Sequence, residues 1–216
     1  MTLGELKTLF SVYLDDLAFG YFTESQVTRY LNQAQRELQK QLVQAGQNYY
    51  TICKQASLVA SSCEYYLPQD FLKLHRLEIV LSGTAPNEIR DPILPITLNQ
   101  QDLVGGTTGT PEVYTLLGNR FKLFPIPDST QTIKLTYSYR VSDMVLDSDV
   151  PDAPEQYHEY ICMLAVKDAF IRDDRDASVI QNKIDSYKEL MKQDAAERQQ
   201  DRGRMIVETG SWDGYF

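Results

Sequence analysis

The chain of 216 residues contains only three cysteines, two histidines and one tryptophan. The cysteines are odd in number and show no Cys-x-x-Cys spacing, which predicts a reducing compartment and no disulfide framework. No apolar run approaches the roughly 20 residues that cross a bilayer, and the first residues lack the pattern of a secretory signal. We therefore expect a soluble protein that is made in a cytoplasm and has no membrane partner.

Positive charge is also scarce. The chain has 21 Lys and Arg against 30 Asp and Glu, which gives a formal net charge of −9 at pH 7. Proteins that wrap nucleic acid neutralise its phosphates with Lys and Arg, so this balance argues against sequence-specific binding of DNA or RNA. An acidic surface would still suit a passage through which DNA moves without adhering.

Known catalytic motifs are missing too. The sequence contains no G-x-S-x-G, H-E-x-x-H or G-x-G-x-x-G, and the glycines at 105–109 are not followed by the lysine of a phosphate-binding loop. His158 and Cys162 lie four residues apart on a predicted helix, but two histidines alone cannot build a zinc site. We predict no catalytic residue, no cofactor and no metal.

An acidic run at 142–152 needs a separate explanation. It brings four carboxylates close together, at Asp143, Asp147, Asp149 and Asp152. The run lacks the central glycine and the terminal glutamate of an EF-hand loop. We interpret it as a solvated loop, with Asp152 as the cap of the helix that follows.

Helical periodicity marks both ends of the chain. Apolar residues at helical spacing predict a helix over 2–16, capped by Thr2 with Glu5, and a second that begins after Thr23, uses Gln26 in its capping box and ends at Gly46. Two more helices are expected in the last third, one after Asp152 and one capped by Asp174 or Asp176. The apolar stripe of the last helix stops near residue 191.

The middle of the chain alternates with period two, which favours strands. Short strands are expected within 49–60, 63–68 and up to about residue 81, then a loop at 82–92, a helical turn near 98–103 and a flexible glycine loop. In 132–141, Ile133 and every second residue after it form a buried face, and Lys134 and its alternates a solvated one. This pattern is typical of an antiparallel sheet.

A hairpin is predicted over 113–124. Gly118-Asn119 fits a type II′ turn, because glycine takes a positive φ at the first turn position. Val113, Thr115 and Leu117 in the first strand, with Phe121 and Leu123 in the second, make the alternating apolar sets. Two prolines at 125 and 127 cannot donate to a ladder, so pairing should stop there.

We therefore predict an α+β protein. A helical bundle would form from residues 1–47 and 143–201, with an antiparallel β-rich lobe, sandwich-like or barrel-like, inserted at 48–142. Residues 202–216 would form an extended tail. Exposed aromatic residues lower solubility unless they meet a partner, so we expect the tail to dock on a neighbouring chain through Arg202, Arg204, Met205, Ile206, Val207, Trp212, Tyr215 and Phe216.

Four stretches resemble one known family, the head-to-tail adaptor proteins of tailed phages, which include the tail tubular protein A type. The similar stretches are YFTESQVTRYLNQAQRELQKQL, CEYYLPQDFLKLHRLEI, GTPEVYTLLGNRFKLFPIPD and IKLTYSYRVSDMVLDSDVPDAPEQYHEYI. Together they cover most of residues 20–170. Phe121 stands where an aliphatic residue is more usual, and the last fifteen residues lie outside the shared pattern.

The resemblance implies a structural virion protein rather than an enzyme. It would form a dodecameric ring at the head-tail interface, bound to the portal protein above and a tail nozzle or tail tube protein below, and it would line part of the channel for genome ejection. By analogy, the helical bundle and tail would face the portal and the β lobe the tail. We place the tail-side contact at the hairpin tip: Leu117, Gly118, Asn119 and Arg120.

Two other readings stay open at this point. The protein could be another neck or tail-completion ring, which gene order would separate from an adaptor. It could also be a cytoplasmic enzyme or ligand-binding domain built on the β lobe. A pocket that joins His75 or His158 to carboxylates would mark that alternative.

Overall fold

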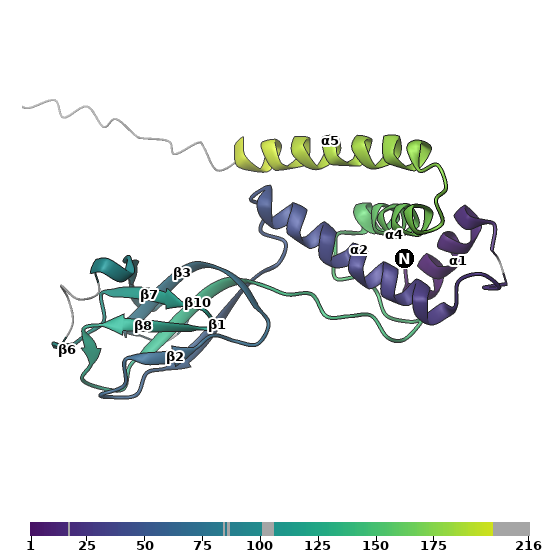
Figure 1. Cartoon of the computed structure of the whole chain (residues 1–216). Coiled ribbons are helices and arrows are strands. Elements are labelled where there is room, and N and C mark those ends of the chain that lie inside the picture. The colour runs from purple at the N-terminus through teal and green to yellow at the C-terminus, as the bar shows by residue number, and fades with distance from the viewer. Residues whose placement is uncertain (17, 84, 86, 101–105, 201–216) are drawn as a thin grey trace, which may run out of the picture. The chain divides into compact units, whose positions relative to one another are not determined.

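A computed structural model describes the whole chain except residues 17, 84, 86, 101–105 and 201–216 (Figure 1). Helices lie at both ends of the sequence and the strands are inserted between them, which confirms the predicted α+β class. The chain divides into two compact units. The helical unit comprises the described residues of Met1–Tyr49 and Asp143–Phe216, and the β unit comprises Tyr50–Ser142.

The first two helices begin as their capping signals predict. Helix α1 spans Leu3–Leu14 and α2 spans Glu24–Gln44. The Thr2 hydroxyl accepts the backbone N–H of Glu5, and the Glu5 carboxylate accepts that of Thr2. Thr23 and Gln26 form the same reciprocal pair at the start of α2. Each pair satisfies two backbone donors that the first turn of a helix leaves unbonded.

Helix α2 ends at a glycine with left-handed backbone geometry. Gly46 has φ 75° and donates its N–H to the Val43 carbonyl at 3.2 Å, while the Gln47 N–H reaches the Leu42 carbonyl at 3.0 Å. These two bonds form a Schellman motif, in which glycine avoids the steric cost of a Cβ. The predicted end of α2 is confirmed.

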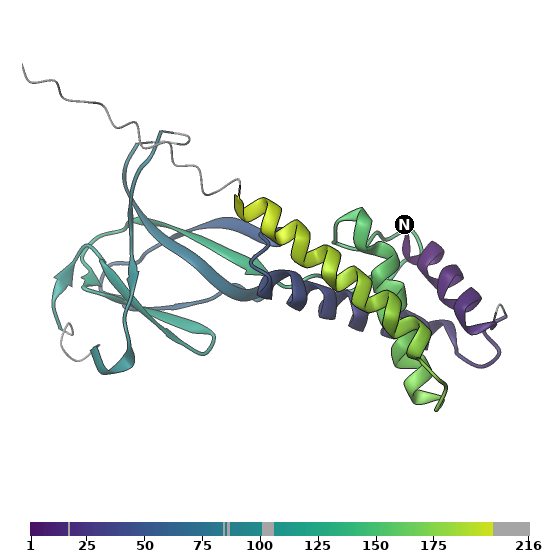
Figure 2. The ribbon, with the colours of Figure 1, turned by 90° about the horizontal axis from the view of Figure 1, so that it is seen from above.

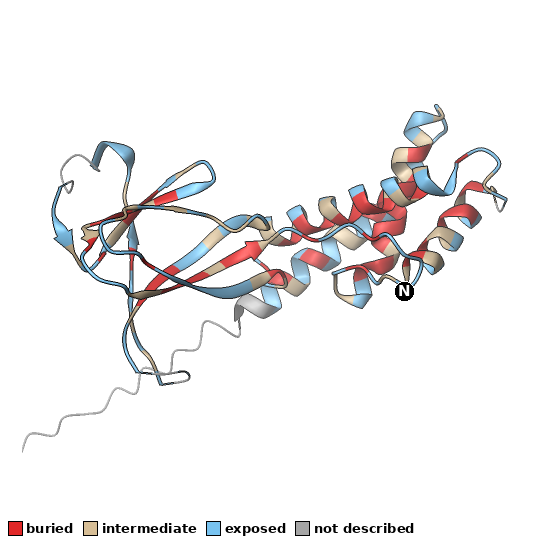
Figure 3. Ribbon diagram, turned by 90° about the horizontal axis from the view of Figure 1, so that it is seen from below, coloured by how far each residue is buried: buried red, intermediate tan, exposed pale blue. Residues whose placement is uncertain are grey.

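The later helices pack around one central element. A 3₁₀ turn at Glu155–Tyr157 leads into α4, His158–Arg172, and α5 spans Ser178–Gln200. Helix α4 contacts α1, α2 and α5, and every residue from Tyr160 to Val166 is buried (Figure 3). A helix that is buried all round lies inside a bundle, so the single apolar stripe predicted for it was too narrow.

One of the two predicted caps in this region is wrong. The residues at the starts of the 3₁₀ turn and of α4 are Pro154 and Tyr157, and neither makes a side-chain cap bond. Asp152 therefore does not cap this helix. For α5, Ala177 occupies the position before the first helical residue. Asp176, one of the two predicted caps, lies one position earlier and accepts the backbone N–H of Ser178 at 2.9 Å.

The described residues of the β unit form two four-stranded sheets. The first has the order β1-β10-β3-β4 and the second the order β2-β8-β7-β5, and a separate two-stranded pair joins β6 and β9. The strands are β1 Thr51–Ser57, β2 Glu64–Tyr66, β3 Phe71–Ser82, β4 Ile89–Pro92, β5 Leu94–Pro95, β6 Thr108–Gly109, β7 Val113–Leu117, β8 Arg120–Phe124, β9 Ile126–Pro127 and β10 Thr132–Tyr139.

A hydrophobic cluster lies between the two sheets. Its buried members from the first sheet are Leu77 and Ile79 on β3 and Ile133, Leu135 and Tyr137 on β10; Tyr114, Phe121 and Leu123 come from the second. Shared burial of side chains from facing sheets is the mark of a sandwich, one of the two architectures predicted for this lobe.

The expected loop at 82–92 is wrong at its C-terminal end. Ile89–Pro92 forms β4, which pairs antiparallel with β3 up to the hairpin between them (Figure 2). The run Ile-Arg-Asp-Pro lacks a clear period of two and contains a proline, so its strand character comes from pairing rather than from local preference. Residues 98–100 are helical, and the rest of the predicted helical turn lies outside the described residues.

The hairpin bounds are confirmed as Val113–Leu117 and Arg120–Phe124. Gly118 has φ 60° and Asn119 does not have a positive φ, which agrees with a type II′ turn. The pairing of β7 with β8 stops at Phe124, as predicted. The prolines do not end all pairing, however, because Ile126–Pro127 pairs in parallel with β6.

The buried face of β7 differs from the prediction. Leu123 lies opposite Tyr114 and Phe121 lies opposite Leu116, and residues directly opposite in a ladder share a face. The core face of β7 therefore carries Tyr114 instead of the predicted set, and Leu116 on the same face is exposed. Thr115 on the opposite face is buried and donates its hydroxyl to the Ile96 carbonyl at 2.9 Å. The bulky tyrosine decides the register, since its ring buries more area than a valine or threonine.

The predicted core face of β10 is confirmed, but its other face is not uniformly solvated. Lys134 and Ser138 are both buried. Lys134 forms an ion pair with Glu88, and the Ser138 hydroxyl lies 2.6 Å from His75 Nε2. Glu88, which precedes β4, and His75 on β3 thus cover part of the polar face of β10.

Candidate interaction surfaces

His158 and Cys162 lie in the packed interior of the helical unit. His158 Nε2 is 3.0 Å from the Ala153 carbonyl oxygen, and burial lowers the pKa of its imidazole. The Cys162 thiol is 3.9 Å from the Leu6 carbonyl, and burial raises its pKa to about 12. A thiol with so high a pKa stays protonated at neutral pH and is a poor nucleophile. Both side chains therefore serve packing.

His75 occupies a different setting, on the outer face of the first sheet. Its ring is exposed, and Nε2 lies 2.6 Å from the hydroxyl of buried Ser138. Burial of part of the ring, together with the charge of Lys73, lowers the pKa of His75. Catalytic serine–histidine pairs have a third group, usually a carboxylate, that orients the histidine. The charged neighbour of His75 is Lys73, a cation that cannot orient the ring in this way. We therefore interpret the His75–Ser138 pair as a contact between adjacent strands.

The acidic run at 143–149 ties the helical unit together. Asp149 accepts the backbone N–H groups of Val145 and Leu146 at 2.7 and 2.8 Å, and these bonds lower its pKa. Asp147 pairs with Lys7 at 2.6 Å, and Asp143 pairs with Arg36. Within the described residues, no group of three or more His, Cys, Asp or Glu is placed to hold a metal. The carboxylates are instead used for intramolecular contacts.

Asn32 is the residue that joins this run to α2. Its side chain is buried and is bound twice by Met144: Asn32 Nδ2 donates to the Met144 carbonyl at 2.9 Å, and the Met144 N–H donates to Asn32 Oδ1 at 2.8 Å. A side-chain amide carries both a hydrogen-bond donor and an acceptor. It can therefore bind the N–H and C=O of one backbone residue at once, as a paired β-strand does. The sequence alone does not single out Asn32, because α2 contains several other amides and two of them, Gln35 and Gln39, are also buried.

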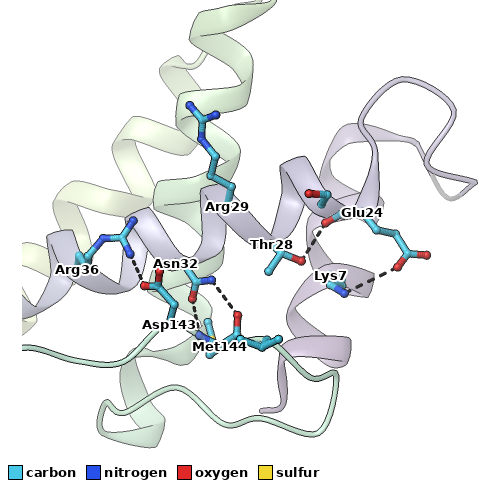
Figure 4. Close-up of a pocket in the computed structure, with 10 residues that line it drawn as sticks. Lys7, Glu24, Thr28, Arg29, Asn32, Arg36, Asp143 and Met144 are labelled. Atoms are coloured by element: carbon cyan, nitrogen blue, oxygen red, sulfur yellow. Dashed lines mark hydrogen bonds and ion pairs between the residues drawn. The ribbon is translucent and has the colours of Figure 1, made fainter.

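A groove of about 630 Å³ opens where this junction meets α1 and α2 (Figure 4). Lys7, Arg29 and Arg36 supply cations to its lining, and Glu24 and Asp143 supply carboxylates. Arg36 turns toward Asp143, whereas Arg29 extends away from the other drawn side chains (Figure 4). An open groove of mixed charge suits contact with a polar segment of another protein, and it lacks the apolar enclosure of a small-molecule site.

Exposed apolar residues continue along the same run. Val145, Leu146 and Val150 are each more than half exposed. Three such residues within six positions form an apolar patch beside the groove, and apolar patches with polar surroundings are typical of protein interfaces.

The hairpin tip at 117–120 is largely exposed, and contacts with β2 hold one of its side chains. Gly118, Asn119 and Arg120 are exposed and Leu117 is half-buried. Arg120 lies over the ring of Tyr66, with 5.1 Å between the guanidinium carbon and the ring centroid, and it pairs with Glu64 at 3.3 Å. Residues of β2 thus hold Arg120, the side chain of the tip that could make a charged contact with a partner.

The predicted tail contact cannot be placed. Arg202, Arg204–Val207, Trp212, Tyr215 and Phe216 all lie outside the described residues.

A family model described as SU10 adaptor protein matches residues 1–210. The chain belongs to this family of phage adaptor proteins. It is therefore a structural phage protein of the adaptor or neck class, as the resemblance implied. Proteins of this class associate with portal and tail components in the virion. No curated protein matches the chain. None of the helices among the described residues is long and apolar enough to cross a membrane.

The stretches that carry the family resemblance have structural explanations in the SU10 adaptor fold. Asp147 and Asp149 hold the acidic run, and His158 closes the start of α4. Asp70 joins three parts of the β unit, since its carboxylate accepts from the Tyr137 hydroxyl at 2.8 Å and from Lys54 at 2.9 Å and its carbonyl accepts the Arg140 N–H. These residues of the four stretches therefore hold the scaffold of the unit in which each lies.

Proposed function

We propose that this protein forms the head-to-tail adaptor ring of a tailed phage. In this role a dodecamer binds the portal protein on one side and a tail nozzle or tail tube protein on the other. The family match over residues 1–210 carries the proposal. A ring requires a heterologous contact that closes on itself, and the exposed patch at Val145, Leu146 and Val150 offers apolar surface for such a contact.

The net charge supports a place in the DNA channel. A chain with formal charge −9 repels phosphates, and binding without cation contacts gains no free energy from counterion release. We infer that DNA passes through the ring without specific binding.

Two surfaces are assigned to partners. The tail residues Arg202, Arg204–Val207, Trp212, Tyr215 and Phe216 would contact the portal or a neighbouring copy, because they supply aromatic and apolar groups that seldom persist without a partner. The exposed hairpin tip at 117–120 would face the tail protein.

The direct test is a mass measurement of the purified protein mixed with its portal. We expect a portal-bound, ring-sized assembly, whereas a monomer that ignores the portal contradicts the proposal. Deletion of residues 203–216 should leave the circular dichroism spectrum intact and reduce assembly, because the described core of the helical unit extends only to Ala195. Unchanged assembly would remove the tail from the proposed interface.

A further inference from the structure

The two main sheets have four outer strands, and three of them have features that block further pairing. Strand β2 has three residues, β5 has two and includes Pro95, and β4 has four and includes Pro92. Short strands and prolines are the usual means by which proteins protect open sheet edges. Strand β1 has seven residues and no proline, and it pairs with β10 without a register shift. It is the outer strand that a further strand would extend best.

The backbone geometry of β1 shows which of its groups point outward. The Leu58 N–H donates to the Gln131 carbonyl at 2.7 Å, and the Tyr139 N–H donates to the Tyr50 carbonyl at 3.0 Å. Residues of an antiparallel pair alternately bond to their partner and point away from it. The even-numbered residues therefore bond to β10. The outward N–H and C=O groups belong to Thr51, Cys53, Gln55 and Ser57.

These outward groups are unused within the described part of the chain, where no backbone hydrogen bond reaches them from outside β10. The side chains of β1 are almost all exposed. Ile52, which lies opposite the buried core residue Tyr137, is 38 % exposed at the margin of the core. A strand added beside β1 would satisfy four residues of backbone and cover this apolar margin.

We propose that residues 204–209 from a second copy of this chain add to β1 as a strand. The proposal rests on the proposed ring and specifies where the tail binds. The sequence Arg-Met-Ile-Val-Glu-Thr is bounded by Gly203 and Gly210 and contains β-branched residues, which favour strands. The run has six residues, one fewer than β1, so it could pair along almost the whole strand. Strand addition gains affinity from backbone hydrogen bonds, with side chains on alternate faces giving specificity.

A second copy is the occupant that a ring requires. Each copy would donate one tail and receive one, which is a heterologous contact able to close a ring. Pairing of β1 with β1 of another copy would instead be two-fold symmetric and would stop at a dimer. The β4 edge is a poorer acceptor, because Pro92 supplies no N–H.

The native Cys53 allows a direct test, since it is a free, exposed cysteine on β1. Neighbouring strands lie about 4.8 Å apart, within the range of roughly 4.4–6.8 Å between Cα atoms that a disulfide spans. One chain would carry Cys63→Ser and keep Cys53. The other would carry Cys53→Ser and Cys63→Ser with one added cysteine, made in turn by Met205→Cys, Ile206→Cys, Val207→Cys and Glu208→Cys. Ser211→Cys is the control outside the run.

The two chains would be mixed, assembled on the portal and oxidised. We expect a disulfide-linked mixed dimer at one or two positions between 205 and 208 and none at 211. Gln55→Pro, which removes an outward N–H while leaving the β10 bonds of Lys54 and Ala56, should abolish the link with the circular dichroism spectrum unchanged. A link that survives Gln55→Pro would overturn backbone pairing.

The remaining outcomes separate this inference from the proposed function. Ring assembly without a mixed dimer overturns strand addition and leaves the adaptor role standing. If a disulfide forms only within a chain that carries both Cys53 and the added tail cysteine, β1 pairs with the tail of its own chain. If a Cys53–Cys53 dimer forms instead, β1 pairs with the β1 strand of a second copy. Either result overturns the proposal. Failure to assemble on the portal contradicts the proposed function, and the inference with it.

Discussion

In the helical unit two buried amide side chains join segments that are far apart in the sequence, whereas in the β unit two buried charged side chains lie on the outer face of a sheet. Asn32 binds Met144 and Gln47 donates to the Met191 carbonyl at 3.0 Å. In the β unit, Lys134 and Glu78 are buried on adjacent strands and reach carboxylates and guanidinium groups nearby. Both units have an apolar core; in the first, buried amides also bind the backbone of distant segments, and in the second, buried charged side chains form ion pairs.

The largest effect should come from the core of the β unit. Leu123→Ala removes a fully buried side chain from the cluster between the sheets and should lower the free energy of unfolding by about 3 kcal/mol, because a cavity remains. The matched control is Leu116→Ala on the paired strand, where the side chain is 44 % exposed and the loss should stay below about 1 kcal/mol. Urea unfolding measures both.

Equal losses at Leu123 and Leu116 would contradict the difference in burial between the two side chains. Amide exchange, measured separately over 50–142 and over the helical unit, should show the Leu123→Ala effect in the β unit first.

The second effect concerns the helical unit. Asn32→Leu keeps the volume of the side chain but leaves the Met144 N–H and carbonyl without their partner, so we expect a loss of about 2 kcal/mol. Amide exchange should accelerate at Val145 and Leu146 before it does in the β unit. The control is Gln33→Leu at the next position, whose side chain is exposed and makes one long bond of 3.3 Å to Asp168.

No acceleration at residues 144–146 would mean that the acidic run is held by Asp149 and the ion pairs alone. In that case buried amides would not be what joins distant segments of the helical unit.

Local signals in the sequence predicted the starts of α1 and α2, the end of α2 and the bounds of the hairpin. Each depends on residues within six positions of one another, as with Thr2 and Glu5 or Gly118 and Asn119. The core face of β7, the strand β4 and the burial of Lys134 were not predicted, because each is decided by a partner distant in sequence. Glu88, for example, lies 46 positions from Lys134.

The candidate surfaces follow the same rule. The hairpin tip could be named from its turn residues, since exposure follows from a two-residue loop. The groove and the open edge of β1 could not. The groove requires the position of 143–145 against α2, and the edge requires the strand order of the sheet, neither of which a single strand or helix encodes.

A smaller effect is expected at the hairpin turn. Gly118 has φ 60° and a Cβ placed there would meet no atom within 4 Å. Gly118→Ala therefore introduces backbone strain without a steric clash, and it should cost about 1 kcal/mol. Asn119→Ala is the control, since Asn119 has no positive φ, and thermal unfolding compares the two. A loss at Gly118 no larger than at Asn119 would contradict the type II′ turn.

The smallest effect at neutral pH should come from the buried ion pair. Lys134→Met replaces the cation with an apolar side chain of similar length. Glu88 keeps a second cation, because Arg90 Nε lies 2.9 Å from its carboxylate, so no buried charge is left unpaired and the loss of stability should be small. The difference should appear in acid. A hydrogen bond from Lys134 is the main cause that lowers the pKa of Glu88 below its ordinary 4.5. Its stabilising contribution is therefore complete above pH 4.5 and is lost as the pH falls through the lowered value.

Without the cation the pKa of Glu88 returns toward its ordinary value, so the decline in stability below pH 4.5 should be shallower in Lys134→Met than in the native chain. Urea unfolding at a series of pH values between about 3 and 7 measures this slope. Lys40→Met in the helical unit is the control, because its partner Glu37 lies 3.7 Å away at the exposed surface and surface pairs contribute little. An acid slope in Lys134→Met as steep as in the control would mean that the outer face of the sheet, like its inner face, is stabilised by packing and not by charge.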